Sequence, residues 1–77
     1  MIQNNERKDN TYRRMQRMVD YLCRKIENRT IEPDAADKME RRIKAFAETH
    51  FADKLELYEM IYTSRFKRLK EQYLHLQ

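Results

Sequence analysis

The 77-residue sequence contains no glycine, a single proline (Pro33) and a single cysteine (Cys23). Without glycine there is no Gly-rich loop of the kind that cradles phosphate groups. One cysteine makes no disulfide within the chain, which is typical of a reducing compartment. No apolar run approaches the roughly 20 residues of a membrane-spanning helix, and the N-terminus is polar. We therefore expect a cytoplasmic protein that does not enter a membrane.

The sequence also lacks the side-chain combinations that catalysis and metal binding need. Cys23, His50 and His75 stand apart from one another, and no Glu-x-x-His pair occurs. A metal site needs clustered ligands, and a cysteine nucleophile needs a histidine beside it. Cys23 borders an apolar stripe, which favours a place in the core. The sequence therefore predicts no enzyme, no metal, no cofactor and no small-molecule substrate.

What the sequence does contain is a long helical pattern in residues 34–77. Apolar side chains recur there every three or four residues, as on one face of an α-helix, and no alternation typical of a strand is present. The stripe consists of Met39, Ile43, Ala47, Phe51, Leu55, Tyr58, Tyr62, Phe66, Leu69, Tyr73 and Leu76. Residues 34–77 are therefore predicted to be helical almost throughout.

Whether residues 34–77 form one helix or two depends on the segment 48–53. Thr49, His50 and Asp53 are weaker helix formers, and Thr49 or Asp53 would suit an N-cap. A heptad seam of the coiled-coil type ends here; its members are Ala36, Met39, Ile43, Phe46 and His50. A break explains the change of face, and so does a straight helix that drifts off a 3.5-residue repeat. We favour a break, with helices at about 33–49 and 51–76.

The N-terminal part predicts a polar tail followed by another amphipathic helix. Residues 1–10 are polar and are expected to be a mobile tail, with Asn10 or Thr11 capping a helix over about 11–28. Pro33 suits the first turn of the next helix and pushes Glu32 out of the helical region. The apolar stripe of this first helix is Tyr12, Met15, Val19, Leu22 and Ile26, widened by Met18 and Cys23.

The short connection between these two helices predicts an antiparallel helical hairpin. The expected fold class is thus all-α, a single domain over residues 11–77 with a hairpin and a long third helix, similar to a three-helix bundle. The hairpin would be roughly 25 Å long and the third helix roughly 40 Å, leaving an overhang of roughly 15 Å. The overhang is apolar, and a second copy around a two-fold axis would cover it. We therefore expect a homodimer with this interface: Phe66, Leu69, Tyr73 and Leu76.

The formal net charge is +4, and some of the charge has a local explanation. Asp37 lies four residues before Arg41, and Glu40 four before Lys44, in the order that favours pairing along a helix. Arg13 and Arg14, in contrast, occupy the first predicted turn of their helix, where the helix dipole disfavours positive charge. One interpretation pairs them with acids near the end of the second helix, such as Glu48. The other is an anionic partner.

These patterns favour binding over catalysis. We expect a small helical binding protein, a self-associating adaptor or regulator that acts through contacts with a protein partner. The alternative is a DNA- or RNA-binding regulator that uses basic side chains to neutralise phosphates. A helix-turn-helix with residues 49–53 as its turn is disfavoured, because Asp53, Glu56 and Glu59 would repel the phosphates. The candidate contacts to nucleic acid or another anion are Arg13, Arg14, Arg17, Arg65 and Arg68.

Overall fold

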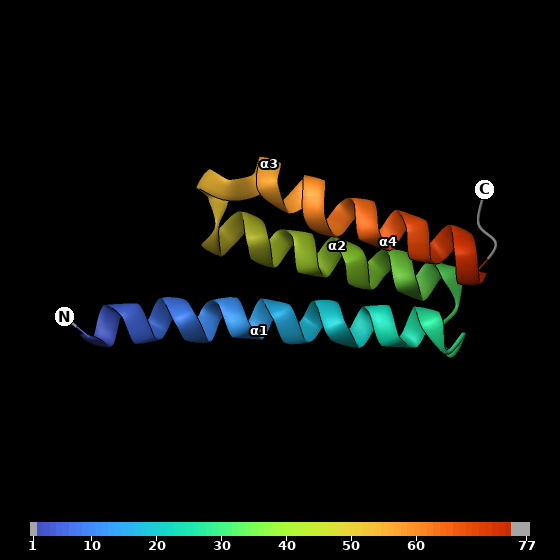
Figure 1. Ribbon diagram of the computed structural model, residues 1–77, viewed down its shortest axis with the longest axis horizontal. Helices are drawn as coiled ribbons and strands as arrows, with labels where there is room; N and C mark the ends of the chain where they lie inside the picture. Colours follow the sequence, from blue (N-terminus) through green and yellow to red (C-terminus); the bar gives the residue numbers. More distant parts are fainter. Residues whose placement is uncertain (1, 75–77) are drawn as a thin grey trace.

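The computed structural model describes residues 2–74, with side chains from residue 10 onward. All regular elements of this part of the chain are helical, and it contains no strand. Helices α1 (Ile2–Glu27) and α2 (Pro33–His50) form an antiparallel hairpin (Figure 1). A 3₁₀ turn, η1 (Ala52–Lys54), leads to the third helix, residues 55–74. The third helix consists of α3 (Leu55–Tyr58), η2 (Glu59–Thr63), α4 (Ser64–Leu69) and η3 (Lys70–Leu74). The predicted all-α class with three helices is confirmed.

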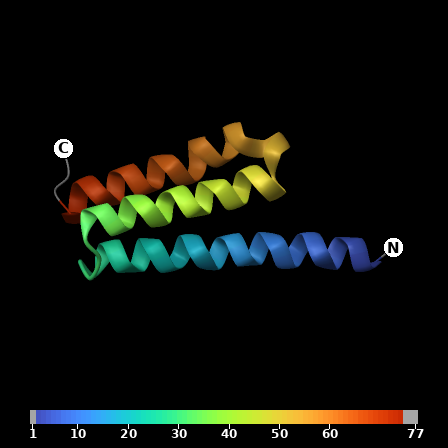
Figure 2. The ribbon, with the colours of Figure 1, turned by 180° about the vertical axis from the view of Figure 1, so that it is seen from behind.

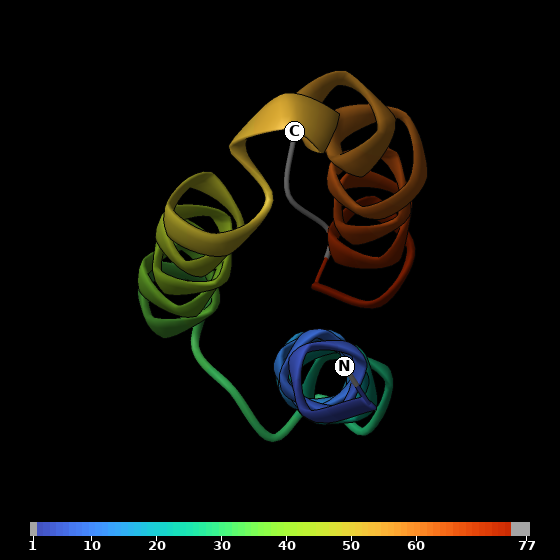
Figure 3. The same cartoon turned by 90° about the vertical axis from the view of Figure 1, so that its left-hand side faces the viewer.

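The three helices pack as a compact bundle around one apolar core. Figure 3 looks along the bundle and shows α1, α2 and the third helix at the corners of a triangle. Each helix contributes one apolar stripe, and each fully buried Leu, Ile, Val or Phe contributes about 1.5–3 kcal/mol to folding. The buried side chains are Met15, Val19, Leu22 and Ile26 of α1, Ala36, Ile43 and Ala47 of α2, and Tyr58, Tyr62 and Phe66 of the third helix.

The end of α1 is closed by a residue with a left-handed backbone. Arg29 has φ 57°. Its N–H donates to the carbonyl oxygen of Ile26, and the N–H of Thr30 donates to that of Lys25, both at 3.0 Å. This pair of bonds is a Schellman C-cap, in which the left-handed position is usually glycine. Because the chain has no glycine, an arginine adopts this conformation.

The two ends of α2 are set by local sequence, as predicted. Glu32 is extended (φ −72°, ψ 149°), and Pro33 begins the helix. At the other end, Phe51 leaves the helical region (φ −136°, ψ 44°) while its N–H donates to the carbonyl oxygen of Ala47 at 2.7 Å. The predicted break between the second and third helices is therefore confirmed, and it falls at Phe51.

The start of α1 differs from the expectation. The helix begins at Ile2 rather than near Thr11, so the segment assigned to a tail is continuous with the first helix. The reason is that residues 1–10 contain neither glycine nor proline and include Gln, Glu, Arg and Lys, which are good helix formers. A residue suited to an N-cap does not mark the start of a helix when the residues before it can themselves be helical.

Parts of the third helix have more residues per turn than an α-helix. Its segments η2 and η3 are π-helical, five residues each. In an α-helix, residues four apart drift by about 40° per step, and π turns remove this drift because each holds one more residue. Tyr58, Tyr62, Phe66, Lys70 and Leu74 therefore face the other two helices together. The first three are buried and the last two are half-buried.

The predicted overhang lies on a different helix. In Figures 1 and 2 the third helix ends beside the start of α2, and it is α1 that projects, past the α2–α3 connection. Helix α1 has 26 residues and α2 has 18, so α1 is longer by about 12 Å. The argument for a dimer through an overhanging third helix is therefore wrong. We call the end with residues 28–32 the closed end, and the end with residues 51–54 the open end.

Candidate functional site

An apolar hollow lies between the three helices at the open end. Helices α1 and α2 are closest beside their connection and diverge toward the open end (Figures 1 and 2). The hollow has a volume of about 500 Å³. Its apolar wall includes Tyr12 and Met15 of α1, Ala47 and Phe51 at the end of α2, and Leu57 and Ile61 of the third helix. The hollow therefore lies at the end of the bundle where α1 and α2 diverge.

Three large apolar side chains of the third helix are exposed next to the hollow. Leu57 is 51% exposed, Met60 73% and Ile61 42%. They lie off the core-facing row of the same helix, whose Tyr58 and Tyr62 are buried. The main apolar stripe of the sequence does not include them. The sequence signal that points to them is a second, short apolar run, in which Met60 and Ile61 follow Leu57 by three and four residues. Clustered exposed apolar side chains mark interaction surfaces.

Tyr12 is fixed at the edge of the hollow by polar and aromatic contacts. The Nε2 of Gln16 donates to the Oη of Tyr12 at 2.7 Å and to the Oη of Tyr62 at 2.6 Å, and the two hydroxyl oxygens are 3.5 Å apart. The Tyr12 ring meets Phe51 edge-on, with centroids 6.2 Å apart. Burial and the contact with Tyr12 raise the pKa of Tyr62 to about 12. Tyr62 therefore stays neutral near pH 7, and these contacts join α1 to the third helix.

Tyr58 lies beside this cluster but takes no part in it. Its ring centroid is 5.3 Å from that of Tyr62. Its hydroxyl is buried and has no hydrogen-bond partner among the described residues. Burial raises the pKa of Tyr58 above its ordinary value. A buried hydroxyl without a hydrogen bond destabilises the fold, so this part of the core is not packed for stability alone.

Exposed charges of opposite sign occur near the open end, the basic ones on α1 and the acidic ones around the α2–α3 connection. Three exposed arginines lie on α1, and three exposed acids lie at the end of α2 and the start of the third helix; they are Arg13, Arg14, Arg17, Glu48, Asp53 and Glu56. None of the six forms an ion pair with another residue in the described part of the chain. The predicted pairing of Arg13 and Arg14 with Glu48 is therefore absent among these residues.

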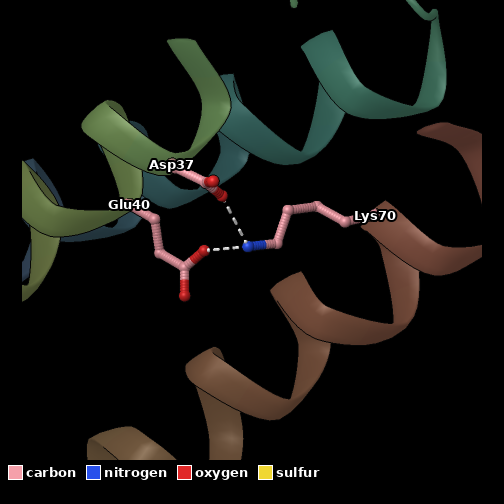
Figure 4. A network of polar contacts seen from close by, with 3 residues as sticks. All are labelled: Asp37, Glu40 and Lys70. Atoms are coloured by element: carbon pink, nitrogen blue, oxygen red, sulfur yellow. Dashed lines mark hydrogen bonds and ion pairs between the residues drawn. The ribbon is translucent and has the colours of Figure 1, made fainter. Parts of the chain in front are cut away.

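The closed end, in contrast, has its charges paired across helices (Figure 4). The Nζ of Lys70 is 2.6 Å from Oε1 of Glu40 and 3.0 Å from Oδ1 of Asp37. Burial acts to lower the pKa of Lys70, but the two carboxylates outweigh it and the pKa is raised. Nearer the open end, Lys44 pairs with Glu59 at 2.9 Å, on an exposed surface. These acids therefore join α2 to the third helix rather than pairing along α2.

The predicted dimer residues do not form an exposed apolar face. Phe66 is 0% exposed within a single chain, so it is part of the core rather than of an exposed face. Leu69 and Tyr73 are half-buried and pack against the same core. Leu76 lies outside the described residues. The third helix uses this stripe internally because it lies along α1 and α2 instead of extending past them.

The five arginines predicted to contact an anion have different surroundings. Arg13, Arg14 and Arg17 are exposed on α1, as described above. The guanidinium carbon of Arg65 is 6.0 Å from the ring centroid of Tyr62, and Arg65 shares a groove with Asp20 and Glu27. Arg68 is exposed on α4. Because acids already surround Arg65, the α1 arginines are the stronger candidates for an anionic partner.

The remaining reactive side chains are dispersed. Cys23 is half-buried, and burial raises the pKa of its thiol. The ring of His50 packs on Phe46 with centroids 4.4 Å apart. Within residues 10–74 no three His, Cys, Asp or Glu side chains are grouped to hold a metal ion. None of the described helices is long and apolar enough to cross a membrane.

Comparison with known proteins identifies no family for this chain. No protein-family model, curated protein or solved structure matches this chain. Its function therefore has to be inferred from its own side chains. Among these, the open end carries the features that folding does not require, namely the exposed apolar cluster and the unpaired charges.

Proposed function

We propose that this protein is a small helical binding protein, an adaptor or regulator that acts through protein–protein contacts at the open end. The observation that carries the proposal is the exposure of Leu57, Met60 and Ile61 beside an apolar hollow. Covering such side chains is favourable in proportion to the apolar area removed from water. A partner surface at the open end would provide that cover.

The shape of the surface favours a protein over a small molecule. Met60 is 73% exposed and stands outside the hollow, where it would contact a partner's surface rather than a ligand inside. Methionine side chains are flexible and adapt to different partner shapes. Rim side chains such as Asp53 and Lys54 add charge around the apolar centre, which is the usual arrangement of a protein interface.

Self-association remains part of the proposal, with its contact surface moved from residues 66–76 to the open end. The cytoplasm remains the proposed compartment. The support for this is compositional: the chain has one cysteine, which is half-buried and free. Free buried cysteines behave as small apolar residues, and a reducing compartment keeps them so.

A photo-crosslinking experiment tests the binding surface. A photoreactive amino acid is placed at Met60 and, as a matched control, at Ala45, which is exposed on α2. In the cells that express the protein we expect discrete crosslinked products from position 60 and only background from position 45. Equal product patterns from the two positions would refute the open end as the binding surface. The mass of the product separates a second copy from another protein.

One observation favours a second candidate function, binding of DNA or RNA. Arg13, Arg14 and Arg17 are exposed within little more than one turn of α1 and pair with no described acid. Arg24 continues the row on the outer side of the same helix. Arginines that neutralise phosphates release counterions, which makes such binding strongly dependent on salt.

Fluorescence anisotropy with a labelled 20-base-pair duplex and a labelled single-stranded RNA tests this alternative. Replacing Arg13, Arg14 and Arg17 together by Ala should weaken binding and lower the slope of log K against log salt by about 2.7 on duplex DNA. The control with the same charge change replaces Lys38, Arg41 and Arg42, which are exposed on α2. An equal loss in both triple variants, or no binding at tens of micromolar protein in low salt, would rule out this function.

A further inference from the structure

We infer that the partner at the open end is a second copy of this chain, bound around a two-fold axis so that the basic side of α1 faces the acidic side of the α2–α3 connection. This inference rests on the proposed function of the open end. In a two-fold dimer the same surface is used twice, so a contact from one residue to another occurs a second time in reverse. A surface can bind its own copy in this way only if it is complementary to itself.

The charges of the open end have this self-complementarity. Arg13, Arg14 and Arg17 are exposed on α1, while the acids around the α2–α3 connection outnumber the one lysine there, Lys54. The acids are Glu48, Asp53 and Glu56. A surface of one sign would repel its copy, whereas this one presents both signs on separate helices. Two copies related by a two-fold axis would place each basic side on an acidic side.

The lack of internal pairing supports contact between chains. Both sets of charges are at the same end of the molecule, yet no ion pair joins them among the described residues. The hollow at this end is lined by Leu57 and Ile61, with Met60 outside it. The same apolar side chains of a second copy would fill the hollow from outside. Apolar contact at the centre and charge pairing at the rim would then form together.

A dimer interface would occupy a modest fraction of the surface of this chain. A specific interface buries about 1,200–2,000 Å² in total, or about 600–1,000 Å² from each copy. That is about a tenth to a sixth of the 6111 Å² surface of this chain. The projecting turns of α1 extend past the other helices at this end (Figure 1). Because an isolated helical segment is marginally stable in water, a second copy beside these turns would stabilise them.

Charge reversal with sedimentation or light scattering tests the inference. Wild-type protein at 50 µM in low salt should have twice the mass of the 9.6 kDa chain, and high salt should shift it toward the monomer. One variant carries Arg13→Glu, Arg14→Glu and Arg17→Glu, and the other carries Glu48→Arg, Asp53→Arg and Glu56→Arg. Each variant alone should dissociate on the order of 100-fold more readily, because six attractive pairs become repulsive.

Mixing the two variants is the decisive step. One variant then has two acidic sides and the other has two basic sides, so a mixed dimer with twice the mass should form again. A control with Lys38, Arg41 and Arg42 reversed on α2 should dimerise like the wild type, and circular dichroism checks that every variant is helical. A monomer for the wild type, or no recovery on mixing, would overturn the inference. Crosslinking to a different protein at Met60 would leave the proposed function standing while refuting the dimer.

Discussion

The closed and open ends of this bundle differ in how completely the chain satisfies its own side chains. At the closed end, Ile26 and Phe66 are fully buried, and Lys70 is paired with two carboxylates. At the open end, apolar side chains are exposed and Tyr58 has a buried hydroxyl without a partner among the described residues. The contrast is the basis for proposing the open end, rather than the closed end, as the binding surface.

The physical origin of the contrast is the geometry of the hairpin. The Schellman cap at Arg29 and the proline at position 33 hold α1 and α2 close at their connection. At the open end the chain connects α2 to the third helix and not to α1, which it meets at the Tyr12–Phe51 ring pair, and α1 and α2 diverge there (Figures 1 and 2). Side chains that would fill a tightly closed core therefore face a hollow instead.

The largest expected effect is the loss of stability when a buried side chain is shortened to alanine, compared with the same change at the open end. Leu22→Ala or Ile43→Ala should lower the free energy of unfolding by about 2–5 kcal/mol, because each removes a fully buried side chain. Ile61→Ala, at the open end, should change it by less than about 0.5 kcal/mol. Urea denaturation followed by circular dichroism measures all three. Similar losses at Ile61 and Leu22 would show that the open end is part of the folding core.

A substitution at Tyr58 is expected to raise the free energy of unfolding, in contrast to the alanine substitutions in the core. Tyr58→Phe removes only the hydroxyl that has no partner among the described residues. Since an unsatisfied buried hydroxyl costs about 1–3 kcal/mol, the variant should be more stable than the wild type by up to that amount. The midpoint of urea denaturation should rise. A lower midpoint would mean that this hydroxyl makes a stabilising hydrogen bond.

At the closed end, Lys70→Met should reduce stability by about 1–2 kcal/mol. This lies between the values for exposed and buried ion pairs, because the side chains of Lys70 and Glu40 are 17% and 22% exposed. The control is Lys44→Met, which removes a pair whose partners are 44% and 43% exposed and should have a smaller effect. Thermal unfolding at low and high salt measures both. If Lys44→Met costs as much as Lys70→Met, the closed end gains no particular stability from its pair.

The smallest effect at neutral pH is expected from Tyr62→Phe, which removes a hydrogen bond from Gln16 worth about 0.5–1.5 kcal/mol. The alkaline range adds a separate test. The folded pKa of Tyr62 is raised from 10.0 to about 12, so the folded state keeps its proton while the unfolded chain loses it. Stability from this group is full below pH 10 and is lost as pH rises toward 12.

The denaturation midpoint of the wild type should therefore fall more steeply between pH 10 and 12 than that of Tyr62→Phe. Other tyrosines and lysines titrate in both proteins, so the difference between the two curves isolates Tyr62. Parallel curves would mean that the hydroxyl of Tyr62 is freely solvated in the folded state.

Local patterns in the sequence were sufficient to predict the hairpin and most of the core. Pro33 and the extended Glu32 set the start of α2, and the weak helix formers near Thr49 marked its end. The spacing of apolar residues identified Leu22, Ile43 and Phe66 as inward-facing. These features depend on a few neighbouring residues and on one helical period, which is why they can be inferred without coordinates.

The features that were missed depend on the relative placement of helices. The partner of Glu40 is Lys70, thirty positions away, because π turns bring that lysine to the side that faces α2. The helix start at Ile2 reversed the length comparison on which the predicted dimer interface rested. The open end itself results from the angle between α1 and α2. No local spacing of residues specifies that angle.

The π segments of the third helix also determine how the chain tolerates a change in its length. A π turn contains one residue more than an α turn, so losing one residue there leaves an ordinary α-helix with its flanking turns in phase. Deleting Met60 from η2 would keep Tyr58 and Phe66 on the core side. Deleting Ala45 from α2 would rotate every later side chain of that helix by about 100°. Single-residue deletions are therefore compatible with the bundle at η2 and η3 and incompatible with it in the middle of α2.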